Sequence, residues 1–152
     1  MPAIVSEQTV HALEITKEEE IAAPIDIVFE TILEEMGPNN ATPQGAMPMV
    51  LEAWPGGRWY RDLGNSTGHF WGNVQAIKPP SLIEICGPLF MSYPAISNVQ
   101  YRLTEENGIT ILKFTHRAIG QIPHDTRIEQ GWGHMLSRIR NQALAATQSA
   151  VR

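Results

Sequence analysis

His116 and Tyr101 are the two side chains whose types and spacing could do chemistry in this sequence. An imidazole titrates near neutral pH and can act as a general base, while a phenol can donate a proton or a hydrogen bond. Together they suit enolate chemistry on a keto compound, or hydrogen bonding to a carboxylate or hydroxyl group without turnover. A buried, neutral histidine that is bonded only to its neighbours is the structural alternative.

The Asn107-Gly108 dipeptide brings this pair together, because it is typical of a two-residue type I′ hairpin turn. The turn pairs Glu106 with Ile109 and thereby fixes the register of both strands. The candidate pair then lies one diagonal step apart on one face of the sheet, within reach of a long side chain. That face is expected to carry the cross-strand pairs Leu103 with Leu112, Tyr101 with Phe114 and Val99 with His116, whereas the other face is mostly polar.

Large aromatic side chains and one methionine are the candidate walls of a ligand cavity. Rings are efficient walls for an apolar pocket, in which a few polar groups fix the orientation of the ligand. The alternative for each residue is that it simply fills the core. Trp54 and Trp59 flank a predicted turn and are left open as surface or rim residues. The candidate ligand-binding residues are Trp71, Phe90, Tyr101, Phe114, His116, Trp132 and Met135.

No pattern in the sequence predicts a metal or a cofactor. His69, His124 and His134 are scattered, without the HxxH or HExxH spacing of a metal site. Cys86 is the only cysteine, which rules out an intrachain disulfide and a cysteine-based zinc site. The nucleophile-elbow, P-loop and dinucleotide-binding fingerprints are missing as well. We therefore expect no metal and no cofactor.

Composition and charge bear on the remaining classes of function. The 152 residues carry a net charge of −5, and the 11 lysines and arginines form no run or stripe, so we expect no nucleic-acid partner. No stretch approaches the roughly 18 apolar residues of a membrane span, and the N-terminal residues lack the basic and apolar regions of a signal peptide. We expect a single domain over residues 1–152, located in the cytoplasm. Whether the chain forms a homodimer is left open.

The longest helical pattern runs from Ile128 to Ala150, with apolar residues at spacing i, i+3, i+4 and i+7. Asp125 or Thr126 can supply an oxygen that caps its start. Gly131 and Gly133 each weaken a helix by up to ~1 kcal/mol relative to alanine. We therefore expect these glycines to mark the point where the start of the helix lies close to a strand or to the mouth of a cavity.

The elements before this helix predict an α+β fold with an antiparallel sheet, because hairpin-linked strands are segregated from the helices. A first strand, a helix of about 12 residues and an irregular segment precede about six strands in three hairpins. The expected elements are a strand over Thr9–Ile21, a helix from Pro24 to Met36, the irregular segment Gly37–Pro48, strands over Met49–Trp54, Arg58–Leu63, Gly68–Lys78 and Leu82–Gly87, and the two arms of the Asn107-Gly108 hairpin.

Several short motifs, in this order and spacing, carry a resemblance to a known family. They are Ile21-Ala22-Ala23-Pro24, Pro55-Gly56-Gly57-Arg58-Trp59, the run from Gly72 to Pro80 (GNVQAIKPP) and Gly131-Trp132. From about residue 12 to residue 147 the chain resembles the START/polyketide-cyclase superfamily (SRPBCC), in the branch of homologues of the activator of Hsp90 ATPase.

The resemblance implies a helix-grip fold, in which a curved antiparallel sheet of six to seven strands wraps around the long C-terminal helix and leaves a cavity between them. It implies, as the leading hypothesis, a protein without enzymatic activity that binds a small apolar or amphipathic molecule, such as a lipid or a polyketide, in that cavity. One alternative is a cyclase- or lyase-like enzyme with His116 and Tyr101 as acid/base groups. Another is a co-chaperone-like interaction module. The segments Gly37–Pro48 and Gly87–Asn98 depart from the family pattern and are expected to border the cavity mouth, the first as a candidate lid.

Overall fold

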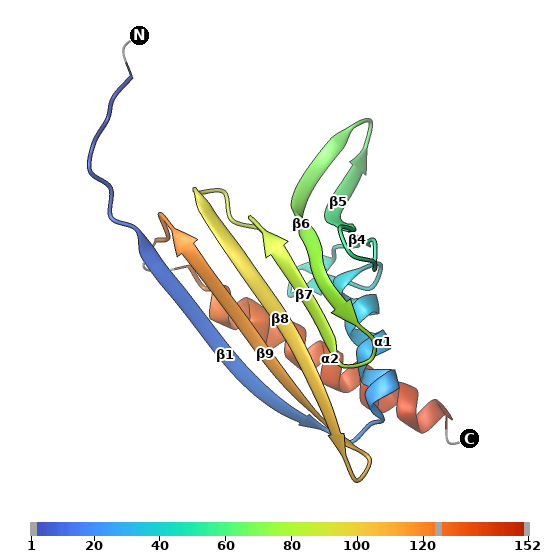
Figure 1. Ribbon diagram of the computed structural model, residues 1–152. Helices are drawn as coiled ribbons and strands as arrows, with labels where there is room; N and C mark the ends of the chain where they lie inside the picture. Colours follow the sequence, from blue (N-terminus) through green and yellow to red (C-terminus); the bar gives the residue numbers. More distant parts are fainter. Residues whose placement is uncertain (1–2, 124–125, 151–152) are drawn as a thin grey trace.

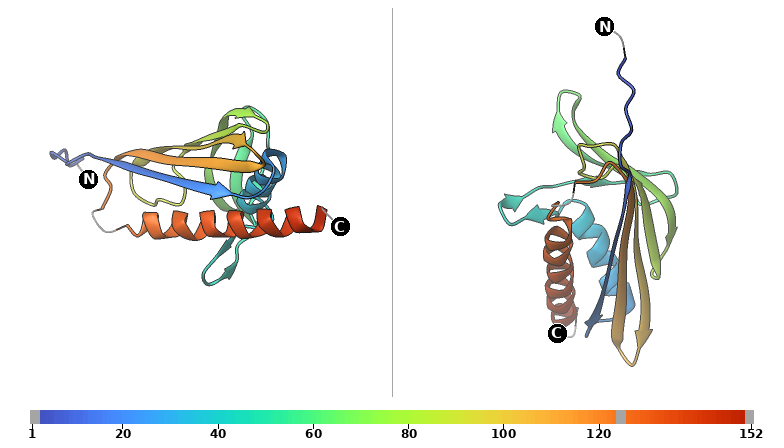
Figure 2. Two further views of the ribbon diagram at one scale, coloured as in Figure 1. Left: turned by 90° about the horizontal axis from the view of Figure 1, so that it is seen from below. Right: turned by 90° about the vertical axis from the view of Figure 1, so that its left-hand side faces the viewer.

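Seven antiparallel strands form one sheet, and two helices lie on one of its faces (Figures 1 and 2). The computed structural model describes residues 3–123 and 126–150. The strand order is β1-β9-β8-β7-β6-β5-β4. The elements are β1 His11–Ile21, α1 Ile25–Met36, β2 Ala41–Thr42, β3 Gly45–Ala46, β4 Val50–Leu51, β5 Arg58–Gly64, β6 Thr67–Lys78, β7 Leu82–Gly87, β8 Ala95–Glu106, β9 Ile109–Gly120 and α2 Ile128–Ala150. The predicted α+β, helix-grip fold is confirmed.

The β8–β9 hairpin has the register that its turn predicts. Glu106 pairs with Ile109, Tyr101 with Phe114 and Val99 with His116. Asn107 and Gly108 both have positive φ, at 53° and 77°, as a type I′ turn requires. The side chains of Val99, Tyr101, Leu103, Leu112, Phe114 and His116 are all buried. A two-residue turn therefore decides which face of these strands meets the helices.

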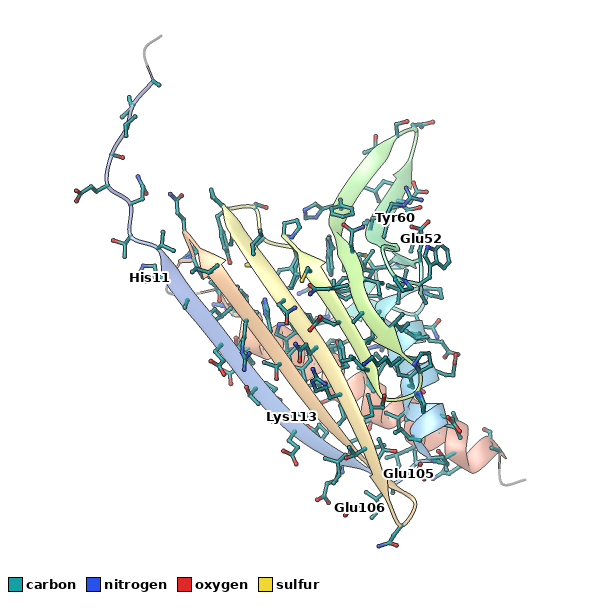
Figure 3. All side chains as sticks on the ribbon, viewed as in Figure 1. His11, Glu52, Tyr60, Glu105, Glu106 and Lys113 are labelled. Carbon is teal, nitrogen blue, oxygen red and sulfur yellow. The ribbon has the colours of Figure 1, made fainter. Side chains whose placement is uncertain are left out.

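Helix α1 begins and ends where the sequence indicates. Pro24 occupies the N-cap position, and Gly37 occupies the C-cap position. The carboxylate of Glu105, at the far end of β8 in Figure 3, accepts a hydrogen bond of 3.2 Å from the Ile25 backbone N–H. Negative charge is favourable at a helix N-terminus. The end of the β8–β9 hairpin is thus tied to the start of α1.

Helix α2 packs along β1 and against α1, and it contributes a continuous apolar stripe to the core. The Oγ1 atom of Thr126 accepts a 3.4 Å hydrogen bond from the Ile128 backbone N–H, as expected for one of the two candidate caps; the other, Asp125, lies outside the described residues. A partly buried ion pair joins the helices. Arg138 Nε lies 2.9 Å from Oε2 of Glu35, whose side chain is 1% exposed.

The edge of the sheet next to α1 is shaped by a tight turn. The predicted strand Met49–Trp54 is shorter in the structure and consists only of β4. After β4, the Glu52 carboxylate accepts three hydrogen bonds of 2.8 Å from Arg58, which donates through its backbone N–H, Nε and Nη2. A Cβ atom on Gly57 would lie 1.8 Å from the backbone oxygen of Glu52, so this position requires glycine. Figure 3 shows Glu52 and Tyr60 at this edge.

The segment Gly37–Pro48, expected to be irregular, contains the small hairpin β2–β3. In Figure 2 this hairpin projects beyond α2, on the side away from the sheet. It is anchored at its base, where the Met47 backbone N–H donates to the Asn40 oxygen at 2.8 Å. The segment therefore stands beside α2 rather than in the main sheet. In the described part of the chain no helix is long and apolar enough to cross a membrane.

Candidate functional site

A pocket of about 300 Å³ lies where the start of α2 meets β5, β6 and the β2–β3 hairpin; we call it the aromatic pocket. Its walls are almost entirely apolar, which is typical of sites for small organic molecules. Trp59 and Trp71 line it and are almost fully buried, at 1% and 8% exposed. Phe90 also lines the pocket and is 37% exposed. The lining residues are Asn40, Ala41, Thr42, Pro43, Met47, Trp59, Trp71, Phe90, Gly131, Trp132, His134 and Met135.

The aromatic rings of the pocket form one connected series from β5 to α2. The ring centroids lie 4.9 Å apart for Trp59 and Trp71, 5.5 Å for Trp71 and Phe90, and 6.1 Å for Phe90 and Trp132. The first two pairs meet edge to face, an arrangement that stabilises aromatic pairs beyond the burial of their surface. The rings therefore support one another, and they present a rigid apolar wall.

All three indole N–H groups of this wall are already bonded to the protein. Trp59 Nε1 donates to the Met36 backbone oxygen at 2.7 Å. Trp71 Nε1 donates to His69 Nδ1 at 3.1 Å, and Trp132 Nε1 donates to His116 Nδ1 at 2.9 Å. The rings are thereby fixed in orientation, and these N–H groups are not available as donors to a molecule in the pocket.

His116 acts here as a buried anchor for Trp132. Because an indole N–H can only donate, Nδ1 of the imidazole accepts and carries no proton. Nε2 therefore carries the proton, and it lies 2.9 Å from Ser97 Oγ. His116 is fully buried, and this burial lowers its pKa to about 4. The ring is neutral at pH 7, with both nitrogens occupied.

Tyr101 and Phe114 lie in the core behind Trp132. Phe114 packs against the Trp132 ring at 4.7 Å and against the Tyr101 ring at 5.1 Å. Neither side chain has any exposed surface, and burial raises the pKa of the Tyr101 phenol. The Tyr101 hydroxyl has no hydrogen-bond partner among the described residues, His116 included. The Tyr/His pair therefore shares a face of the sheet without forming a hydrogen-bonded pair.

The structure separates the predicted ligand-binding residues into two groups. Trp71, Phe90, Trp132 and Met135 line the aromatic pocket, whereas Tyr101, Phe114 and His116 do not. The resemblance implies a cavity between the sheet and α2. Around Phe114 this space is filled, because Phe114 packs against Tyr101 and Trp132. The open volume lies instead at the N-terminal end of α2, where residues of the Gly37–Pro48 segment and Phe90 of the Gly87–Asn98 link complete the walls.

Sequence reasoning missed several residues of the pocket. Trp59 was left open as a surface or rim residue, and in the structure it is buried on β5. Asn40 and Met47 belong to Gly37–Pro48, which was expected at the mouth but without assigned residues. His134 was considered only as a metal ligand. Its place two residues after Trp132 and one before Met135 on α2 was the available signal.

The expectation for Gly131 and Gly133 holds only in part, because the helix start borders the pocket at Gly131 but no strand lies close to either glycine. Among the described residues, apart from the neighbouring residues and backbone of the helix itself, a Cβ atom at either position would have no atom within 4 Å, so no strand approaches them closely. Gly131 lines the aromatic pocket and Gly133 does not. At Gly131 the missing side chain keeps the pocket open, at a cost in helix stability of up to ~1 kcal/mol.

Comparisons with solved structures show the fold. An uncharacterized protein from Rhizobium leguminosarum matches with a TM-score of 0.71 and 16% identity, covering 92% of this chain and 99% of that one. Protein CV1439 from Chromobacterium violaceum matches at 0.69 and 15%, covering 86% and 96%. CalU16 from Micromonospora echinospora matches at 0.59 and 19%, covering 88% and 81%. At these identities the likeness establishes architecture and not a ligand.

The family comparison is more specific. No curated protein matches the chain. The family described as Activator of Hsp90 ATPase homolog 1-like protein matches residues 22–143, from the start of α1 to the middle of α2. This range includes every residue that lines the aromatic pocket. The chain belongs to the Activator of Hsp90 ATPase homolog 1-like family.

Proposed function

We propose that the protein binds a small apolar or amphipathic molecule in the aromatic pocket. The observation that carries the proposal is the pocket itself, about 300 Å³ with almost wholly apolar walls. Its size lies at the lower end of the usual range for small-molecule sites. The three tryptophans that wall it are held in place by hydrogen bonds directed into the protein. A rigid site of this kind loses little conformational entropy when a ligand binds.

Gly131 offers a direct test, because a side chain there would enter the pocket from an otherwise undisturbed helix. Gly131→Leu fills part of the volume, and the added Cβ meets no atom within 4 Å. Gly133→Leu is the matched control, since it adds the same side chain to the same helix outside the pocket. N-phenyl-1-naphthylamine, a neutral probe that fluoresces in apolar sites, reports binding through its emission and through quenching of tryptophan emission.

We expect the wild type and Gly133→Leu to bind this probe with similar Kd values. Gly131→Leu is expected to weaken binding at least ~10-fold, equivalent to ~1.4 kcal/mol. Equal binding by all three proteins would show that the probe sits elsewhere, and no binding by the wild type would remove the proposal. Circular dichroism of both variants checks that α2 is retained.

Two alternatives from the sequence have weaker support. The acid/base pair does not line the pocket, and a histidine with a pKa of about 4 and two occupied nitrogens is a weak base at neutral pH. The interaction module requires an exposed face. Ile96 and Ile119 are 68% and 57% exposed on the outer face of the sheet, but nothing in the structure indicates a chaperone as their partner. The cytoplasmic location, the single domain and the open homodimer stay predictions.

A further inference from the structure

Residues 3–10 form an extended arm that leaves the sheet at the start of β1 (Figures 1 and 2). Every residue of this arm is exposed. Ile4 and Val5 are 91% and 95% exposed, and Val10 is 59% exposed. Among the described residues, the only hydrogen bond of the arm joins two of its own side chains. Three apolar side chains of the arm are therefore open to solvent.

A groove of about 600 Å³ lies at the same end of the sheet, on the face away from the helices; we call it the outer groove. Its lining is largely apolar and comes from β1, β9, β8 and β7. Along one side Ile119 stands between its cross-strand partners Ala12 and Ile96. Ile119 and Ile96 are 57% and 68% exposed. A contiguous exposed apolar row of this kind is typical of a surface that binds another molecule.

The other side of the outer groove is polar. Arg117 stands there between its cross-strand partners Glu14 and Asn98. Arg117 Nη2 lies 3.7 Å from Glu14 Oε1, and the two side chains are 65% and 63% exposed. An exposed ion pair of this kind contributes little to stability. Because a guanidinium carries five N–H donors, Arg117 can bind a second carboxylate without releasing the first.

The arm matches the groove in pattern and in length. Successive side chains of an extended chain alternate, so Ile4 and Val10 lie on one side of the arm and Glu7 lies on the other. Glu7 is also the only charged residue of the arm. The apolar side of the arm therefore fits the apolar row of the groove, and Glu7 fits Arg117. At ~3.3 Å per residue the arm is about 26 Å long, which exceeds the ~15 Å across four strands.

The sequence at the base of the arm directs it away from the groove of its own molecule. Folding back would need a tight reversal next to β1, and such turns are usually made by glycine, proline, asparagine or aspartate. The base of the arm, Gln8-Thr9-Val10, contains none of these residues. Its two β-branched residues favour extended backbone instead, and the arm continues beyond the sheet (Figure 1). The groove that the arm can reach is therefore one on another molecule.

We infer that the outer groove binds the N-terminal arm of a second copy of this chain, so that two copies exchange their arms. Arm and groove lie at the same end of the sheet, so one two-fold axis lets each copy fill the groove of the other and closes the assembly as a dimer. In this dimer Ile4 and Val10 pack on the apolar row, and Glu7 binds Arg117. The aromatic pocket lies on the helix side of the sheet, so arm exchange does not depend on ligand binding there.

Sedimentation velocity of the full chain over a range of concentrations measures the dimer. We expect the wild type to show a reversible monomer–dimer equilibrium. Glu7→Arg and Arg117→Glu should each raise the Kd of the dimer at least ~10-fold, equivalent to ~1.4 kcal/mol, because each variant brings like charges together. The double variant restores opposite charges and should return the Kd to within ~3-fold of the wild-type value. Lys113→Glu makes the same change further along the same face of β9 and should leave the Kd unchanged (Figure 3).

The apolar contact is tested with a second set of variants. Ile119→Asp in the groove and Ile4→Asp in the arm should each raise the Kd at least ~10-fold, because the dimer would bury an unpaired carboxylate. Ile109→Asp is the matched control, since Ile109 is 40% exposed at the opposite end of the same face of β9 and lies outside the groove. Circular dichroism checks that each variant is folded.

Three outcomes would overturn the arm exchange. One is a wild type that stays monomeric at every concentration; protection of residues 3–10 from hydrogen exchange in that monomer would place the arm in its own groove. Another is a dimer that neither Arg117→Glu nor Ile119→Asp weakens, because its interface would lie elsewhere. The third is a dimer that Ile119→Asp weakens and Ile4→Asp does not, because two sheet faces would then meet without the arms.

Discussion

The burial of His116 predicts a specific loss of stability in acid. Its pKa is near 6.5 in the unfolded chain and about 4 in the folded protein, since burial disfavours the charged ring. Between these values the unfolded state binds the proton more tightly. The contribution is therefore fully present above pH 6.5 and is lost as the pH falls toward 4.

The size of the loss follows from the two pKa values. Between pH 7.5 and 4.5 the protonation of His116 should lower the free energy of unfolding by about 2–3 kcal/mol, because each pH unit between the two values contributes ~1.4 kcal/mol. This is a large share of the 5–15 kcal/mol that is typical of folded domains. Protonation also removes the acceptor at Nδ1, so the Trp132 N–H bond is lost with it.

Urea unfolding at several pH values measures the effect, and His116→Gln isolates it. Glutamine can accept from Trp132 and donate to Ser97 but cannot be protonated in this range. We expect its free energy of unfolding to fall by about 2–3 kcal/mol less than that of the wild type between pH 7.5 and 4.5. His69→Gln makes the same change at an exposed ring that also accepts a tryptophan N–H, and it should keep the wild-type difference because His116 is still present. Parallel pH curves for the wild type and His116→Gln would refute the reasoning.

Two further predictions concern α2. Gly133→Ala should raise the free energy of unfolding by about 0.5–1 kcal/mol, because alanine is the better helix former and the added Cβ has open space around it. Gly72→Ala should instead be destabilising, because its Cβ would lie 2.6 Å from a backbone oxygen of the next strand. Thermal unfolding that ranks the two variants in the opposite order would contradict the geometry. Arg138→Ala should cost about 2–3 kcal/mol in urea unfolding, because it leaves the buried Glu35 carboxylate without its ion pair while Arg138 itself is only partly buried. Arg140→Ala, which breaks a more exposed pair, is its control, and equal losses would count against the prediction.

The sequence by itself determined most of the architecture. The Asn107-Gly108 turn has few alternatives in its backbone conformation, so it set the register of β8 and β9 and the burial of His116. The apolar stripe of α2 and the boundaries Pro24 and Gly37 of α1 likewise depend on local preferences that each residue carries with it. Such signals are readable because they act over a few neighbouring positions.

Only the tertiary structure decided where the open volume lies. Phe114 and Tyr101 were equal candidates with Trp71 for the cavity wall, since an inward-facing ring has the same pattern whether its neighbour is a ligand or another ring. Phe114 is part of the core because it packs against Trp132, a residue of α2 that lies 18 positions further along the chain. The hairpin that carries Asn40 meets α2 only in three dimensions.

The two glycines of α2 show the same division. Gly131 and Gly133 flank the same tryptophan, Trp132, and both weaken the helix. Residues two positions apart on a helix point in different directions. The orientation of α2 against the sheet therefore places Gly131 at the pocket and Gly133 outside it. The sequence therefore determined the helix and the sheet face that meet, and long-range packing decided that a gap remains at one end and which side chains surround it.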